Sequence, residues 1–393
     1  MAIAEKISQF MERSSWIRKM FEEGAALKAQ YGADQVCDFT LGNPDVPAPP
    51  QVEDELVKII REPAALKYGY MPNAGYPETK AAVAEFLSGE QHVKVNPQGI
   101  VMTTGAGGAL NVIFKAILNP GDEVISPSPF FVEYNFYVDN HGGVLRKLEP
   151  TEDFSLDLDA IAAAINEKTA AVIINSPNNP SGVVFSAEQI TALGKLLAEK
   201  SIEFKRTIYL ISDEPYRKLV YDGLVVPPIF PAYKNSIIAN SYSKELSLAG
   251  ERIGFLALHP EADDFESLTN GFLFTNRILG FVNAPGIMQR LIARLQGVTV
   301  DINIYQKKRD HLYQGLVDAG FKVAKPQGAF YLFPHSPLPD DVEFVRELQH
   351  YKILAVPGSG FSGPGHFRLS YCVDDDTIER SLPLFKEIGA KFC

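Results

Sequence analysis

The feature that most constrains the fold is an alternation of short apolar runs with helix-like segments between about residues 99 and 258. The runs are GIVMTT, DEVISPS, GVLRKLE, AVIINS, TIYLISD, SIIANS and IGFLALH, and segments such as GALNVIFKAIL, VEYNFYVDN and QITALGKLLAEK lie between them. Strands that are apolar on both faces and separated by helices are typical of a mostly parallel sheet covered by helices on both sides. We therefore predict an α/β fold.

The two ends of the chain depart from this alternation. Large apolar residues recur every three or four positions over residues 7–27, which predicts an amphipathic packing helix that ends at Tyr31, with Trp16 and Ile17 able to border a pocket. Beyond about residue 290 a long helical stretch, the strand-like AFYLF and HFRLSYC and a closing helix predict a smaller α+β domain.

The proline-dense LGNPDVPAPP is incompatible with regular helix or central strand and marks a domain boundary. We expect an N-terminal arm over residues 1–40 that packs with the small domain, a large domain over residues 41–289 and a small C-terminal domain over residues 290–393.

Charge and cysteine content narrow the classes of partner. The chain has 37 basic and 48 acidic residues, a net charge of −11, and no basic block, which argues against nucleic acid and anionic membrane. Cys37, Cys372 and Cys393 are too few and scattered for a disulfide framework or a metal cluster, and the histidines form no spaced cluster either. Charged residues interrupt the N-terminal segment and no apolar run reaches eighteen residues. We expect a soluble, cytoplasmic protein without a bound metal.

Sheets of this class bind ligands outside the carboxyl ends of their strands. Polar residues that follow the predicted strands are therefore the first candidates for chemistry. They are Thr104-Gly105, Ser126-Pro127, Asn175 to Gly182, Asp213 to Tyr216 and Ser241 to Lys244.

Lys244 follows the strand SIIANS within SYSKELSLAGERIG. Ser241 and Ser243 precede it, and Arg252 lies eight residues further on. A lysine fixed near hydroxyls and an arginine is suited to forming a Schiff base beside a phosphate, because nearby cations and burial favour its neutral amine. The alternative is a solvated surface lysine.

Asp213 ends the apolar strand of TIYLISD, with Tyr216 three residues later. A carboxylate aimed at a pyridine nitrogen keeps that nitrogen protonated and makes the ring an electron sink. A helix N-cap or a metal ligand is the alternative. TTGAGGAL, between a strand and a helix, lets backbone approach a phosphate at a helix N-terminus, although a ligand-free turn fits equally well. It is neither a Walker A loop nor GxGxxG, which disfavours nucleotide binding.

Four motifs occur together and in one order, namely NSPNNPSG, SDEPY, SYSKELSLAGERIG and FRLSYC. Their combination resembles the pyridoxal-phosphate-dependent aminotransferases of fold type I, class I/II, of the aspartate aminotransferase kind. The resemblance extends from LGNPD at residue 41 to RLSYC at residue 372. It implies that the large domain binds pyridoxal 5'-phosphate.

The resemblance also implies a role for individual residues. Lys244 matches the lysine that holds the cofactor as an internal aldimine and then moves a proton between substrate and cofactor. Asp213 matches the partner of the pyridine nitrogen, and Tyr216 and Asn179 match the groups that hydrogen-bond the phenolic oxygen. Arg368 matches the arginine that binds the substrate α-carboxylate.

Further matches concern the phosphate and the edges of the site. The phosphate contacts match the backbone of Ala106 and Gly107 and the side chains of Ser241, Ser243 and Arg252. Phe131 matches the aromatic residue that stacks on the pyridine, where tryptophan or tyrosine is frequent, and Ser181 stands where threonine is commoner. Gly42 and Asn43 match the loop beside the substrate carboxylate. Tyr70 matches a tyrosine that reaches the phosphate of the neighbouring subunit, which implies a homodimer with shared active sites.

The sequence therefore predicts an aminotransferase that moves an α-amino group from an L-amino acid to a 2-oxo acid. A β-lyase or other carbanion chemistry on an amino acid begins from the same bound state and stays open. A regulatory module that retained the fold is disfavoured by the presence of Lys244. The donor amino acid is not identified, and no second arginine can be assigned to a side-chain carboxylate of the substrate. Arg277 is a candidate only by its expected location in a loop between domains, and we assign it a structural role.

Overall fold

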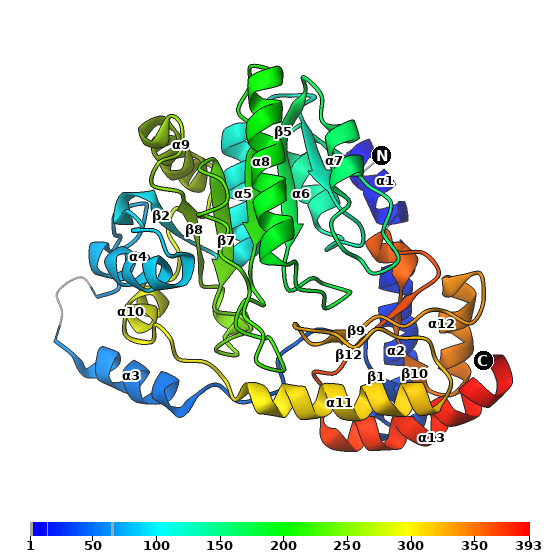
Figure 1. Ribbon diagram of the computed structural model, residues 1–393. Helices are drawn as coiled ribbons and strands as arrows, with labels where there is room; N and C mark the ends of the chain where they lie inside the picture. Colours follow the sequence, from blue (N-terminus) through cyan, green and yellow to red (C-terminus); the bar gives the residue numbers. More distant parts are fainter. Residues whose placement is uncertain (1–2, 14, 64–66) are drawn as a thin grey trace.

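The computed structural model describes residues 3–13, 15–63 and 67–393 (Figure 1). Within these ranges the chain forms a seven-stranded sheet with helices on both sides, as the apolar runs predicted. In spatial order its strands are β2 (Ile100–Thr103), β8 (Gly254–Leu258), β7 (Ser236–Ser241), β6 (Tyr209–Asp213), β5 (Thr169–Asn175), β3 (Glu123–Ser126) and β4 (Val144–Lys147). β8 runs antiparallel to β2 and β7, and the other pairings are parallel. The sheet is thus mostly parallel.

The alternation of side chains along the strands divides the interior around this sheet into two layers. In β5, Val172 and Ile174 belong to one apolar cluster, which includes residues of α8, whereas Ile173 belongs to a second cluster, which includes residues of α5. The helices that accompany the sheet are α3 (Pro50–Arg61), α4 (Pro77–Gln91), α5 (Gly105–Ile117), α6 (Tyr134–Asn140), α7 (Leu158–Ala164), α8 (Ala187–Glu203), α9 (Phe265–Ile278) and α10 (Gly286–Arg294). Both faces of the sheet are therefore buried.

The C-terminal part builds a separate apolar cluster around smaller sheets. β11 (Val356–Pro357), β12 (Phe367–Ser370) and β9 (Tyr331–Leu332) form an antiparallel sheet, and β1 (Cys37–Asp38) pairs in parallel with β10 (Ile353–Leu354). α11 (Ile302–Asp318), α12 (Asp341–His350) and α13 (Asp375–Phe392) surround them. The long helix, the strand-like AFYLF and HFRLSYC and the closing helix were predicted. The helix α12, whose ten residues follow the cap residue Asp340, was not predicted.

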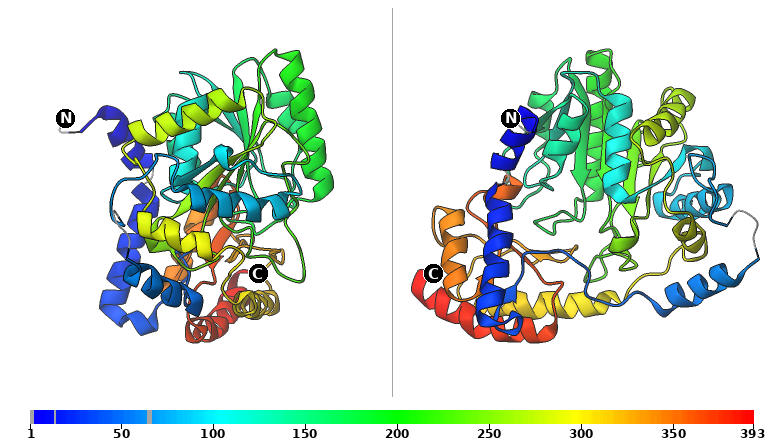
Figure 2. Two further views of the ribbon diagram at one scale, coloured as in Figure 1. Left: turned by 90° about the vertical axis from the view of Figure 1, so that its left-hand side faces the viewer. Right: turned by 180° about the vertical axis from the view of Figure 1, so that it is seen from behind.

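The N-terminal segment is helical on both sides of residue 14, over the range where a helix was predicted. It forms α1 (Glu5–Arg13) and α2 (Ser15–Tyr31), and α2 ends at Tyr31 as expected because Gly32 takes a φ of 92°. α2 lies beside the C-terminal elements (Figure 2), and a Cβ on Gly24 would meet Leu354 at 2.7 Å. The expectation that Trp16 and Ile17 border a pocket concerns side chains outside the described part of the chain.

Two shorter features complete the description. LGNPDVPAPP lacks helix up to Pro49, and Pro50 then provides the first turn of α3, where a missing N–H is tolerated. Single-turn helices occur at η1 (Ala33–Gln35), η2 (Pro97–Gly99), η3 (Ala249–Glu251) and η4 (Gly358–Phe361). Over the described ranges, the helices all fall short of the length and apolarity needed to span a membrane.

Candidate active site

A pocket of about 310 Å³ lies at the carboxyl ends of β5, β6 and β7, next to the start of α5. Of the candidate cofactor- and substrate-binding residues, all except Tyr70 and Asn43 line it: Gly42, Ala106, Gly107, Phe131, Asn179, Asp213, Tyr216, Ser241, Ser243, Lys244, Arg252 and Arg368. Lining residues that were not among the candidates predicted from the sequence are Leu41, Leu110, Tyr137, Ala249 and Tyr331. Side chains spread over more than 320 positions are thus brought to one edge of the sheet.

Lys244 follows β7 and directs its amine into this pocket. Its Nζ donates a hydrogen bond to the Gly42 carbonyl oxygen at 2.7 Å. Burial lowers the pKa of Lys244 to about 8, and the positive charges of Arg368 and Arg252 act in the same direction. A large share of the neutral, nucleophilic amine is therefore present slightly above neutral pH.

Asp213 is the last residue of β6, and its two carboxylate oxygens have different surroundings. Oδ2 accepts a hydrogen bond from the Tyr134 hydroxyl at 2.6 Å. Oδ1 is buried and has no hydrogen-bond partner among the described residues. Burial raises the pKa of Asp213 to about 7, the bond from Tyr134 opposes this rise and the Glu214 charge adds to it. A buried oxygen without a donor is costly, and a protonated ring nitrogen would satisfy it.

Tyr216 and Asn179 both line the pocket and take part in two separate sets of hydrogen bonds. The Tyr216 and Tyr331 hydroxyls are 2.9 Å apart, and the Asn179 Oδ1 accepts from Arg368 Nη1 at 3.1 Å. Asn175, at the end of β5, accepts from the Asn179 backbone N–H at 2.7 Å and donates to the Asp213 carbonyl at 2.8 Å. Asn175 falls within the strand-end residues singled out from the sequence, so that rule located it without giving its role.

Arg252 and the first turn of α5 form a cradle with free donors. Gly105, at a φ of 73°, begins α5, and a Cβ there would lie 2.9 Å from Arg252 Nη2. The absence of a side chain lets the guanidinium approach the helix N-terminus, whose N–H groups face an anion favourably. Ser241 and Ser243 line the same pocket. These donors suit a phosphate.

Arg368 is held in a fixed orientation at the other end of the pocket. Its guanidinium carbon lies 4.5 Å from the ring centres of both Tyr331 and Phe361, and Nη2 donates to the Thr40 carbonyl at 2.6 Å. Its Nε is buried without a partner among the described residues. A planar fork with an unused donor suits a carboxylate.

Three other candidates lie elsewhere. Tyr70 is 93% exposed, outside the pocket. Asn43 lines an adjacent hollow together with Asp45. The expectation that Arg277 lies in a loop is wrong, because it belongs to α9 and stacks on Phe274 at 5.2 Å.

The pocket as a whole fits a phosphorylated pyridine aldehyde. Lys244 offers an amine, Asp213 an unpaired carboxylate oxygen and the α5 cradle a place for a phosphate. Phe131 lines the wall between them, where an aromatic ring can stack. The group implied by the sequence motifs is thus matched by the residues present.

Comparison with known proteins identifies the family to which the chain belongs. The family model described as "Aminotransferase class I and II" matches residues 34–383. An aspartate/prephenate aminotransferase of Thermus thermophilus is 33% identical, over 91% of this chain and 91% of the relative. An aspartate aminotransferase of Bacillus subtilis is 33% identical, over 91% and 92%.

Solved structures agree with the relatives. An aminotransferase from Eubacterium rectale superposes with a TM-score of 0.96 at 41% identity, covering 100% of this chain and 99% of that one. The aspartate aminotransferase of Thermus thermophilus with maleate gives 0.82 at 29% identity, over 94% and 95%. The chain therefore belongs to the class I and II aminotransferase family and is a pyridoxal-phosphate-dependent aminotransferase that acts on amino acids and 2-oxo acids.

Proposed function

We propose that the pocket around Lys244 and Asp213 is the transamination site and that its residues have the roles implied by their motifs. The observation that carries this proposal is the unpartnered Asp213 Oδ1, buried in the same pocket as the amine of Lys244. Pyridoxal phosphate, when bound, supplies an electrophilic aldehyde carbon and an electron-withdrawing ring. The chain supplies orientation, charge and proton transfer.

Lys244 and Asp213 act on protons at two different atoms. The Lys244 amine is neutral in a large share of molecules near pH 8. It takes the proton from the substrate Cα and delivers a proton to C4′, the aldehyde carbon of the cofactor. Asp213 Oδ1 holds a proton on the ring nitrogen, and the Tyr134 bond to Oδ2 favours the charged carboxylate that this requires. Tyr216 and Asn179 hydrogen-bond the phenolic oxygen.

The remaining residues position the two anionic ends of the reactants. Arg252, Ser241, Ser243 and the backbone of Ala106 and Gly107 bind the phosphate. Arg368 binds the α-carboxylate of the donor, beside Gly42 and Asn179. The fixed distance between these two anchors directs the Cα–H bond toward Lys244.

We further propose a homodimer with shared active sites. Tyr70 is 93% exposed and Tyr68 is 78% exposed, while Val57 and Ile60 of the preceding α3 are 44% and 56% exposed. Exposed apolar side chains gathered near one segment are typical of an interface. A second copy that covers them would receive Tyr70 at its own phosphate cradle.

The division into an arm, a large domain and a small domain is a proposal as well. It is supported by the apolar cluster around β9, β10 and β12, which is separate from the two clusters at the large sheet. The free thiols of Cys37, Cys372 and Cys393 are consistent with the predicted cytoplasmic location.

The experiment that tests the site is a single-turnover screen of donors. Holoenzyme is mixed with one amino acid at a time, and conversion of the bound cofactor to its amine form is followed by absorbance. Aspartate is tried first because the Thermus thermophilus and Bacillus subtilis relatives are named for it. Asparagine, alanine and phenylalanine follow.

The α-carboxamide of the same amino acid is the matched control for each donor, because it keeps the carbon skeleton and the Cα–H bond but lacks the charged α-carboxylate. We expect conversion with at least one amino acid and far less with its control, because Arg368 has no α-carboxylate to bind in the latter. Equal conversion of both would contradict the role of Arg368. Release of ammonia and pyruvate from a cysteine-type substrate, without conversion of the cofactor, would favour a β-lyase.

A further inference from the structure

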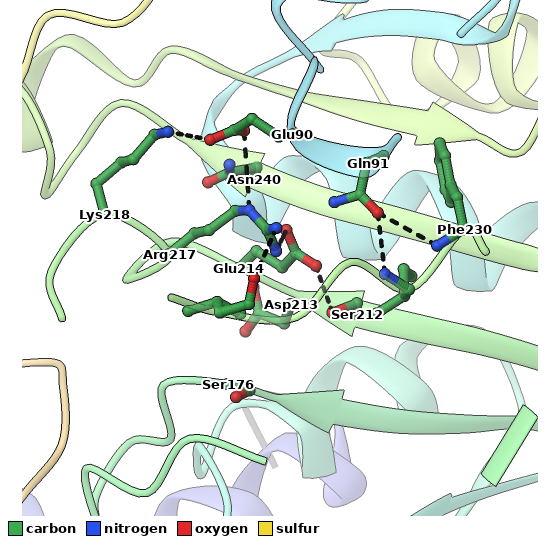
Figure 3. A network of polar contacts seen from close by, with 12 residues as sticks. Glu90, Gln91, Ser176, Ser212, Asp213, Glu214, Arg217, Lys218, Phe230 and Asn240 are labelled. Atoms are coloured by element: carbon green, nitrogen blue, oxygen red, sulfur yellow. Dashed lines mark hydrogen bonds and ion pairs between the residues drawn. The ribbon is translucent and has the colours of Figure 1, made fainter. Parts of the chain in front are cut away.

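A network of buried charged groups lies behind the pocket, on the opposite face of the sheet from the Asp213 carboxylate. Side chains alternate along β6, so Ser212 faces away from Asp213, and Glu214, the residue after the strand, hydrogen-bonds to Ser212 on that side. The Glu214 carboxylate accepts hydrogen bonds from Ser212 Oγ at 2.8 Å and from Arg217 Nη1 at 3.2 Å (Figure 3). Glu214 and Arg217 are 1% and 6% exposed, so neither is solvated.

The network continues from Arg217 to α4. Arg217 Nη2 donates to the Val226 carbonyl at 3.0 Å, and its Nε lies 3.8 Å from Glu90 Oε2. Glu90 is also paired with Lys218, whose amine lies 4.6 Å from the centre of the Phe86 ring. Figure 3 shows Lys218, Glu90, Arg217, Glu214 and Ser212 joined in a row. The segment after β6 is thereby tied to the C-terminal end of α4.

The placement of these groups along the chain links them to the site. Glu214 lies between Asp213 and Tyr216, and Arg217 directly follows Tyr216. The backbone of the turn is held by bonds from Glu214 N–H to the Ala239 carbonyl at 2.8 Å and from Arg217 N–H to the Glu214 carbonyl at 3.1 Å. A shift of either network side chain must therefore move a neighbour that lines the pocket.

We propose that Glu214 and Arg217 are positioning residues whose buried ion pair fixes the 213–217 turn, and with it the direction in which Asp213 Oδ1 and the Tyr216 hydroxyl enter the pocket. Glu90 and Lys218 secure the outer side of Arg217. The proposal rests on the role proposed above for Asp213, and it assigns to the network an effect on cofactor binding beyond its effect on stability. Small displacements at such a site are costly because the cofactor contacts depend on fixed geometry.

The charges around the pair are consistent with this role. The negative charge of Glu214 raises the pKa of Asp213, so a cation beside Glu214 limits that effect. Two carboxylates, Glu90 and Glu214, face two cations, Arg217 and Lys218. Glu245 faces the same group, and burial raises its pKa to about 8, which leaves it largely neutral at pH 7. The net charge of these side chains is therefore close to zero at pH 7.

Arg217→Met tests the proposal by removing the cation while keeping much of the side-chain volume. The Glu214 carboxylate must then take up a proton or a water molecule, and either change moves the turn. Removing one partner of a buried pair is far more disruptive than replacing both, so we expect pyridoxal phosphate to bind the apoprotein about tenfold more weakly in Arg217→Met and within about threefold of wild type in Glu214→Gln/Arg217→Met. Equilibrium dialysis measures the affinity, and the absorption maximum of the bound cofactor reports its environment. Arg217→Lys, which keeps the charge, should give an intermediate affinity.

Arg309→Met is the matched control for loss of a buried arginine. Arg309 is fully buried and pairs with Asp222 at 2.8 Å, but it does not line the pocket. We expect it to lower the melting temperature of the apoprotein without changing cofactor affinity. If Arg217→Met and Arg309→Met lower affinity alike, or if Arg217→Met binds as wild type, the positioning role is wrong.

Two further variants keep the outcome decisive. If Arg217→Met does not fold, the cofactor affinity of Glu214→Gln is compared with that of Glu214→Gln/Arg217→Met. A higher affinity in the double variant supports the proposal, and the same or a lower affinity contradicts it. Asp213→Asn is measured in parallel. Unchanged affinity in Asp213→Asn would refute the proposed role of Asp213 itself, whereas weak binding there combined with normal binding in Arg217→Met would refute only the positioning role.

Discussion

Replacement of Tyr134 by phenylalanine isolates one hydrogen bond that controls the charge of Asp213. The Tyr134 hydroxyl donates to Asp213 Oδ2 at 2.6 Å, and both side chains are buried. Burial raises the pKa of Tyr134 well above its ordinary value, so the hydroxyl stays protonated and remains a donor. Tyr134→Phe removes that donor and leaves the ring in place.

The size of the effect follows from the burial of the pair. A hydrogen bond to a charged group contributes about 1.5–3 kcal/mol, which makes ionisation of Asp213 roughly 10- to 100-fold less favourable once it is lost. With a wild-type pKa of about 7, half of the Asp213 carboxyls are charged at pH 7. In the variant the charged fraction falls to about 1–10%, so cofactor affinity at pH 7 should drop roughly 5- to 50-fold. The effect fades as the pH rises, because alkali ionises Asp213 in both proteins.

The assay is equilibrium dialysis of apoprotein against pyridoxal phosphate at pH 7 and pH 9. At pH 9 the ratio of wild-type to variant affinity should shrink to about twofold or less. Lys244 also loses its proton over this range, but it does so in both proteins, and the ratio cancels its contribution. Tyr233→Phe is the control, since it removes a buried hydroxyl that donates to the Ile208 carbonyl at 2.9 Å.

The ratio also defines what would refute the reasoning. A ratio that is large and equal at both pH values would mean that Tyr134 acts through packing and not through the charge of Asp213. A ratio near one at both values would mean that the Asp213 carboxylate does not hold the ring nitrogen. A Tyr233→Phe profile that matches Tyr134→Phe would mean that the loss is general.

Three other variants address the remaining roles. Lys244→Ala should abolish turnover yet still bind the cofactor through the phosphate cradle, and a variant with wild-type turnover in the donor screen would refute its role. Arg368→Lys keeps the charge but loses the planar fork, so the free energy of amino-acid binding should weaken by about 1–3 kcal/mol, measured as a higher amino-acid concentration at half-saturation of the half-reaction. An unchanged saturation curve would contradict the assignment. Mixed Tyr70→Phe and Lys244→Ala chains should form hybrid dimers more active than either parent, because one site then combines both wild-type residues; no gain despite proven chain exchange would exclude a shared site.

The sheet and the centre of the site could be predicted from the sequence because both depend on local patterns. Apolar runs separated by helices imply buried parallel strands, and residues at their carboxyl ends imply a site, which is where Asp213 and Lys244 lie. The reversed direction of β8 was not predictable, since IGFLALH has the composition of a buried parallel strand. The helix α12 was missed because it is only ten residues long and offers few apolar positions for a periodic pattern. Its buried residues Phe344, Val345 and Leu348 belong to the apolar cluster of the C-terminal part.

The hydrogen-bond partners of the site residues could not be predicted from the sequence, for a different reason. Tyr134 lies 79 positions from Asp213, and Tyr331 lies 115 positions from Tyr216. Neither belongs to a motif with a fixed spacing, and an aromatic residue in a helix or strand is ordinarily a core residue. Their contacts arise only once α6 and β9 are packed against the ends of the strands.

The end of β6 explains why the residues of the SDEPY motif cannot be treated singly. Asp213 lines the pocket, whereas Ser212 and Glu214 hydrogen-bond to each other on the other side of the segment, so the carboxylate proposed to hold the cofactor is adjacent to side chains anchored in the protein interior. On the positioning role proposed for Glu214 and Arg217, the turn that they hold keeps Asp213 Oδ1 free for the cofactor, whereas an unrestrained carboxylate would turn to find a donor or water. Binding and support are therefore encoded by alternating positions of one short segment, and a substitution on either face is expected to affect the same cofactor contacts.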